Sequence, residues 1–161
     1  MIFKAARPLS IFTAIMVLVS CSGMSQKIFE YESTKSLDEA MQDAVFAITE
    51  ENFRITGNLH IGKTIQERGN PEFPMNEVIL FCNLGYAQEM LTIDPAFINY
   101  CPYRVSIREH NQKVIIGTML LPEKTGNSKM NELTSRINII LRNIVKYTAE
   151  EDPIMLYEDD E

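Results

Sequence analysis

The chain has 161 residues, of which 15 are basic and 22 acidic, and its formal net charge is −7. This length is enough for one domain with a substantial hydrophobic core. The acidic excess argues against nucleic acid as a partner, because phosphates require a basic patch, and against attraction to anionic lipid head groups.

The N-terminus carries the pattern of a secretory signal. Lys4 and Arg7 precede an almost uninterrupted apolar stretch over residues 8–19, and a short basic region before a short apolar one is typical of such signals. The stretch is shorter than the roughly 20 residues that a membrane-spanning helix requires. It ends in Leu18-Val19-Ser20-Cys21, which resembles the bacterial lipobox. The resemblance implies a signal peptide over residues 1–20, diacylglycerol on the Cys21 sulfur and acylation of its new amino group.

A lipid on Cys21 predicts a membrane partner and a location. One acyl chain holds a protein to a membrane only marginally, so stable anchoring requires more than one, for example with palmitate. Ser22, rather than an acidic residue, follows the cysteine, and by resemblance to sorted lipoproteins this favours the outer membrane, facing the periplasm. Residues 21–27 are predicted to be a lipidated tether. Two alternatives stay open: signal cleavage without lipid, and a cytosolic protein with an apolar N-terminus.

The folded domain is predicted to begin with a strand near residues 28–31 and an amphipathic helix. Ser36 and Glu39 form a capping box, in which each side chain bonds the backbone of the other. Apolar residues follow at helical spacing, so one face is apolar and the helix is expected to end near Glu51.

The next segments alternate between strands and short helices. Residues 53–59, with a turn at Gly57, predict a second strand. Residues 61–67 predict a short helix that Gly69 ends, and the apolar run at 78–81 predicts a buried strand.

The second half predicts a helix over residues 86–93, broken by Pro95, and then a hairpin. Apolar and polar residues alternate over 103–108, which is typical of a strand with one wet face. A turn over 109–112 and a strand over 114–119 complete the hairpin.

A long amphipathic helix over 130–145 ends the domain, and an acidic tail covers residues 150–161. Each helix has one apolar face and so covers one side of a sheet. We therefore expect a single α+β domain over residues 28–149, built as a two-layer sandwich with a mainly antiparallel sheet of about five strands and helices packed on one face.

The stretch from 78 to 122 carries a family pattern: an apolar strand ending in Cys-Asn, a helix with alanine and leucine, an Asp-Pro pair, and a hairpin whose first strand follows a proline. The matching residues are Phe81-Cys82-Asn83, Ala87, Met90-Leu91, Asp94-Pro95 and the run from Pro102 to Glu109. This pattern resembles the family named domain of unknown function 302, over about residues 28–147. The resemblance implies a compact unit with helices against an antiparallel sheet, and no biochemical role.

Two positions depart from the family pattern. Leu84 stands where the family usually has proline, and Tyr103 stands where many members have cysteine. Cys101 lies two residues before Tyr103, and two positions on one strand share a face. A displaced sulfur on the same side of the sheet is therefore expected.

Cys82 and Cys101 are the candidate functional or disulfide residues. Disulfides persist in an oxidising compartment, and a bridge closing this loop is worth about 3 kcal/mol on the chain-entropy model. Two buried thiols are the alternative. Cys82 also stands between a strand and a helix, where a reactive thiol is favoured.

The candidate ligand-binding residues are Asn83, Tyr103 and Arg104. Backbone N–H groups after Asn83 can bind an anion, although a helix cap is the commoner role of such an asparagine. His60 and His110, with the two cysteines, are possible zinc or copper ligands, but their spacing is loose and we predict no metal and no cofactor.

The leading hypothesis is a non-enzymatic envelope lipoprotein whose small domain binds a ligand or partner protein. The alternative is a thiol-dependent redox or metal-handling periplasmic protein that uses Cys82 and Cys101. No phosphate loop, dinucleotide fingerprint or nucleophile–base pair is present in the sequence.

Mass spectrometry of the mature protein, extracted from membranes, tests the lipid anchor. We expect residues 1–20 to be absent and Cys21 to carry acyl chains. Cys21→Ala is expected to move the protein to the soluble fraction, because the acidic surface offers no other attachment. Cys82→Ala is the control and is expected to stay in the membrane. Retention of Met1, or an unmodified Cys21 thiol, contradicts the anchor.

Overall fold

The computed structural model describes residues 27–150 of the chain. The predicted signal peptide, Cys21 and the acidic tail from residue 151 onward lie outside this range. No helix within residues 27–150 is long and apolar enough to span a membrane. The elements are β1 (Ile28–Ser33), α1 (Leu37–Glu50), β2 (Arg54–His60), α2 (Ile61–Glu67), β3 (Asn76–Cys82), α3 (Leu84–Ile93), the 3-10 helix η1 (Pro95–Tyr100), β4 (Tyr103–His110), β5 (Lys113–Met119) and α4 (Ser128–Ala149).

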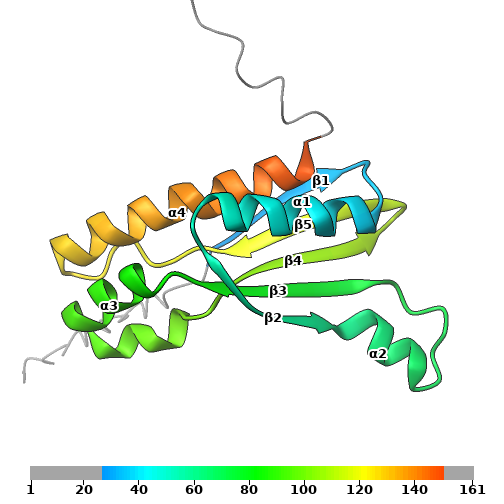
Figure 1. Ribbon diagram of the computed structural model, residues 1–161, viewed down its shortest axis with the longest axis horizontal. Coiled ribbons are helices and arrows are strands. Elements are labelled where there is room, and N and C mark those ends of the chain that lie inside the picture. The colour runs from blue at the N-terminus through cyan, green and yellow to red at the C-terminus, as the bar shows by residue number, and fades with distance from the viewer. Residues whose placement is uncertain (1–26, 151–161) are drawn as a thin grey trace, which may run out of the picture.

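The five strands form one antiparallel sheet in the order β1-β5-β4-β3-β2. Helices α1 and α4 lie side by side on one face of this sheet, while α2 and α3 lie at its two opposite ends (Figure 1). This arrangement confirms the predicted two-layer α+β fold with an antiparallel sheet. The face of the sheet that α1 and α4 leave uncovered is called the open face below.

The core lies between the sheet and the two long helices. On β4, Tyr103, Val105 and Ile107 are buried, while the alternate residues Arg104 and Ser106 are not, as expected when one face of a strand packs and the other is wet. Helix α1 contributes mainly alanines, and α4 contributes larger side chains, so the two helices fill the core unequally. The largest fully buried side chains include Phe81, Ile48, Ile79, Met90, Ile107, Ile116, Met130, Leu133, Ile137, Leu141 and Ile144.

On the β1–β5–β4 half of the open face, charged side chains cover the strands. Arg108 of β4 makes two hydrogen bonds, of 2.8 and 3.2 Å, to the carboxylate of Glu30 on β1. The pair reaches across β5, where a Cβ on Gly117 would meet the Glu30 side chain at 3.0 Å. Lys113 of β5 pairs with Glu32 on the neighbouring strand β1. The glycine therefore allows a two-pronged ion pair to lie close over the sheet.

The predicted capping box begins α1. The Ser36 backbone N–H donates to the Glu39 carboxylate at 2.9 Å, and the Ser36 hydroxyl oxygen accepts from the Glu39 backbone N–H at 3.3 Å. The Ser36 hydroxyl also donates to the Glu39 carboxylate at 2.7 Å, and this bond, followed by the one from the Ser36 backbone N–H, lowers the pKa of the Glu39 carboxyl. The cap satisfies two backbone groups that the first turn would otherwise leave unpaired.

Two local expectations were wrong, and one element was not predicted. Gly57 is not a turn: it lies inside β2, at a register shift between Ile55 and Gly57 that bulges the strand. The hairpin turn is confined to residues 111–112, because both strands extend further than their apolar residues indicated. The 3-10 helix η1 was not predicted: Pro95 ends α3 but also begins this helix, and the Asp94 side chain caps it by accepting from the Ala96 N–H.

One buried polar side chain joins the end of β5 to α4. Asn138 is 1% exposed. Its amide oxygen accepts from the Leu121 N–H at 2.8 Å, and its amide nitrogen donates to the Leu121 carbonyl at 3.0 Å and to Glu123 at 2.9 Å. The side chain thus imitates a strand neighbour for a segment that has left the sheet, which keeps buried backbone groups paired.

Asn138→Ala tests this connection. The substitution leaves the N–H and the carbonyl of Leu121 buried without partners, and we expect it to lower the free energy of unfolding by about 2–4 kcal/mol. Asn99→Ala is the matched control, because Asn99 only bonds its own turn at the surface, and we expect a change below about 0.5 kcal/mol. Urea unfolding followed by circular dichroism measures both. Equal effects of the two substitutions would contradict the assigned role.

Candidate functional site

The structure brings Cys82 and Cys101 together. Cys82 is the last residue of β3, and Cys101 follows η1 and precedes Pro102 through a cis peptide bond. Because Phe81 pairs with Tyr103 across β3 and β4, the end of one strand lies beside the start of the next. The two Sγ atoms are 3.0 Å apart, and both cysteines are free and half-buried.

Burial disfavours the thiolate form of Cys101. Burial, and then the hydrogen bond with Cys82, raise the pKa of the Cys101 thiol to about 12. At neutral pH this thiol is protonated, and only the thiolate is nucleophilic. If the pair exchanges with another disulfide, Cys82 is therefore the attacking sulfur and Cys101 the one that closes the bridge.

Asn83 is committed to the start of α3. Its side-chain oxygen accepts from the N–H groups of Gly85 and Tyr86 at 3.0 and 3.2 Å, and its amide donates to the Asn52 carbonyl at 3.0 Å. The cap occupies the N–H groups that an anion would need. Asn83 thus places α3 rather than presenting a binding atom.

Tyr103 and Arg104 point to opposite faces of the sheet. Tyr103 is buried on the helix side, its ring lies against Phe53 and Phe81, and burial raises the pKa of its phenol. Arg104 is exposed on the open face, where it contacts the sulfur of Met119 at 3.8 Å. The expectation that positions 101 and 103 share a strand face is wrong, because β4 begins only at Tyr103. Of the predicted site residues, the two cysteines are in direct contact and Tyr103 lies near both of them, whereas Arg104 faces the other side of the sheet.

Of the candidate metal ligands, the two cysteines are in contact, but the two histidines have other partners. His60 bonds the Glu77 carboxylate at 2.5 Å, and His110, the last residue of β4, bonds the side chain of Asn111 at 3.1 Å. No group of three or more His, Cys, Asp or Glu side chains suited to a metal ion occurs within residues 27–150.

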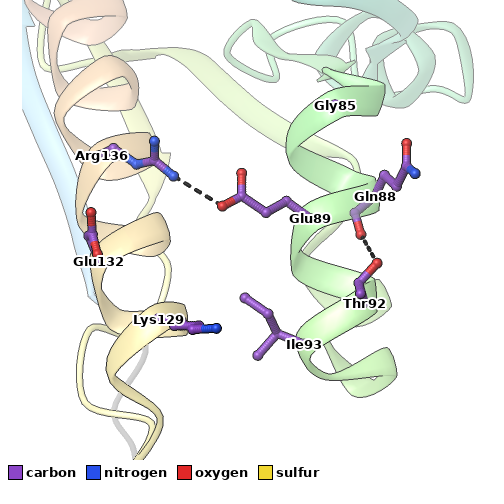
Figure 2. Close-up of a pocket in the computed structure, with 8 residues that line it drawn as sticks. All are labelled: Gly85, Gln88, Glu89, Thr92, Ile93, Lys129, Glu132 and Arg136. Atoms are coloured by element: carbon purple, nitrogen blue, oxygen red, sulfur yellow. Dashed lines mark hydrogen bonds and ion pairs between the residues drawn. The ribbon is translucent and has the colours of Figure 1, made fainter.

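A groove between α3 and α4 was not anticipated from the sequence. Its volume is about 590 Å³. Figure 2 shows Glu89 and Arg136 pointing toward each other across it, 3.2 Å apart, and Lys129 facing Ile93 further along. Both partners of the ion pair are about half exposed, and such pairs contribute little to stability. The lining residues are Gly85, Gln88, Glu89, Thr92, Ile93, Lys129, Glu132 and Arg136.

The sequence held a partial signal for this groove. On α3, polar residues recur at Gln88, Glu89 and Thr92, and on α4 the charged residues at 129, 132 and 136 are three and four apart. Residues at that spacing share a helix face. No local pattern indicates that these two polar faces meet, because η1, β4, β5 and their loops separate α3 from α4 along the chain.

Comparisons with known proteins show the family and the fold. The family model described as domain of unknown function DUF302 matches residues 29–147. The crystal structure of an uncharacterized conserved DUF302 protein from Bacillus stearothermophilus has a TM-score of 0.68 and 14% sequence identity, covering 75% of this chain and 97% of that one. No curated protein matches the chain. The chain therefore belongs to the DUF302 family.

Proposed function

We propose that this DUF302 protein is an envelope lipoprotein, anchored through Cys21, whose domain binds a ligand or partner protein in the groove between α3 and α4. The observation that supports this proposal is the groove itself. It is a concave surface of about 590 Å³ between two helices, with hydrogen-bonding and charged groups on both walls. Concave surfaces with a few convergent polar groups are the usual sites of recognition.

Two acidic and two basic side chains line the groove, so its formal charge is zero and it favours a polar ligand that carries both kinds of charge. Glu89 and Arg136 neutralise each other across the groove, whereas neither Lys129 nor Glu132 forms an ion pair with any of the described residues. Lys129 stands in the first turn of α4, where a cation is disfavoured by the helix dipole. An acidic group of a ligand beside Lys129 would compensate for this unfavourable interaction with the helix dipole.

The position of α3, one wall of the groove, depends on contacts with the sheet and with η1. The Asn83 cap and the neighbouring Cys82 hold the N-terminal end of α3 to the sheet, and η1 packs against the helix. Few contacts join α3 directly to α4. The width of the groove is therefore set by the segment between the two cysteines.

A photoreactive amino acid placed at Thr92 tests the groove in living cells. We expect a discrete cross-linked species at Thr92 and none at Gln42, an exposed control position on α1. Arg136→Glu places two like charges across the groove and is expected to reduce cross-linking about tenfold, the factor that 1.4 kcal/mol produces. Identical species from both positions, or no effect of Arg136→Glu, would count against the groove as the binding surface.

A second candidate function, thiol–disulfide exchange, has one observation in its favour, the 3.0 Å separation of the two sulfurs. In such an exchange, the Cys82 thiolate attacks a partner disulfide and releases one partner thiol. Cys101 then displaces the second, after losing its proton. Two hydrogen atoms leave the protein, one Sγ–Sγ bond forms, and the partner disulfide becomes two thiols.

Maleimide labelling in glutathione buffers decides whether the pair exchanges. After equilibration in reducing buffer and unfolding, we expect maleimide to label both cysteines. After equilibration in oxidising buffer, we expect it to label neither. Oxidation should raise the free energy of unfolding by about 3 kcal/mol, because the bridge closes the loop that contains α3 and η1. The double variant Cys82→Ser, Cys101→Ser is the control and should show neither effect. If maleimide still labels both thiols after equilibration in oxidising buffer, the pair forms no disulfide and the exchange function is wrong.

A further inference from the structure

A buried carboxylate lies at the end of the sheet opposite the cysteines. Glu77 of β3 is 3% exposed, and its Oε2 lies 2.5 Å from Nδ1 of His60, at the end of β2. Burial of a carboxylate is costly unless a partner compensates for lost water. The His60 side chain, in contrast, is 54% exposed. Glu77 therefore fixes the ring of a histidine whose other nitrogen, Nε2, is left without a partner within residues 27–150.

Short contacts hold α2 beside this pair. A Cβ on Gly62 would lie 2.5 Å from the Asn76 backbone nitrogen, so only glycine allows α2 to approach the start of β3. The Thr64 hydroxyl donates to the His60 carbonyl at 2.7 Å, and the Gln66 amide donates to the Phe73 carbonyl at 2.6 Å. Gly62 is the only buried residue of α2. The helix is thus fixed by polar contacts and does not add side chains to the core.

A hollow of about 550 Å³ opens over this rigid corner, and its surface is mainly apolar. Leu59 and Ile61, which line it, are 47% and 43% exposed. Two cationic or hydrogen-bonding groups border the apolar surface, Arg68 and the His60 ring. The lining residues are Asn58, Leu59, His60, Ile61, Thr64, Ile65 and Arg68.

The charge of the hollow contrasts with that of the chain. The protein has 22 acidic and 15 basic residues, yet no carboxylate lines the hollow. Arg68 makes no ion pair with any residue in the described range. An unpaired guanidinium beside exposed aliphatic side chains matches a ligand that has a carboxylate at one end and an apolar body.

We propose that this hollow binds an amphiphilic carboxylate of the fatty-acid type, a second site independent of the α3–α4 groove. The carboxylate pairs with the Arg68 guanidinium, and the His60 ring borders its second oxygen. The hydrocarbon lies over Leu59 and Ile61, which removes their apolar surface from water. Glu77 is a positioning residue, because it orients the His60 ring through Nδ1 and does not reach the ligand.

NMR titration with octanoate tests the site. The titrated protein is residues 22–161 without lipid, which keeps every described element. The solved DUF302 neighbour, 97% of which aligns with this chain, shows that such a domain folds without further domains. We expect saturable shifts of the backbone amides of α2 and the end of β2. Octanol, which has the apolar body alone, and acetate, which has the carboxylate alone, should each bind at least about tenfold more weakly.

Three variants separate the assigned roles. Arg68→Ala should weaken octanoate binding at least about tenfold, while Arg54→Ala, which removes an exposed arginine at the other end of β2, should leave it unchanged. Glu77→Gln keeps the shape of the side chain and should weaken binding with an unchanged amide spectrum elsewhere. The proposal is overturned if octanoate gives no saturable shift, if octanol binds as tightly as octanoate, or if Arg54→Ala and Arg68→Ala have equal effects.

Discussion

Burial of one face of the sheet under α1 and α4 is the interaction on which the other features depend. The buried side chains of β3, β4 and β5 meet the inner faces of both helices in one continuous core. Burial of apolar surface is the main favourable term in folding. Because α1 and α4 occupy this face side by side (Figure 1), the two shorter helices have no place on it. They lie at the ends of the sheet instead.

The position of α2 and α3 at the ends explains where the candidate sites are. A helix that does not cover the sheet keeps much of its surface exposed, and only Gly62 of α2 and Ala87 and Met90 of α3 are buried. Polar contacts act beside this limited apolar packing, through the Asn83 cap at one end and the His60–Glu77 pair at the other. Each contact leaves a concave surface beside the helix that it fixes.

The three cysteines belong to two different parts of the protein. Cys21 belongs to the predicted anchor, whereas Cys82 and Cys101 belong to the folded domain and touch each other. Their contact joins the ends of the segment that carries α3 and η1. A change in their bonding would therefore act on one wall of the α3–α4 groove, and the binding and thiol hypotheses concern the same part of the molecule.

The sequence predicted the helices, the strands and the hairpin well, because each rests on a local pattern. The capping box at Ser36 and the apolar stripe of α4 need only neighbouring residues to be recognised. The errors were also local: Gly57 looked like a turn because glycine is common in turns, but the strand passes through it with a bulge. Asn138 was overlooked because an asparagine on an apolar stripe has no distinguishing pattern until its partner, Leu121, is known.

What the sequence by itself determined is the type and order of the elements, the family resemblance, and the identity of the residues worth testing. The tertiary structure alone decided which of them meet. Cys82 and Cys101 are 19 residues apart, His60 and Glu77 are 17 apart, and Glu89 and Arg136 are 47 apart. Such pairs depend on strand register and on which helices share a face. A shift of one residue in register would turn each side chain to the other side of the sheet.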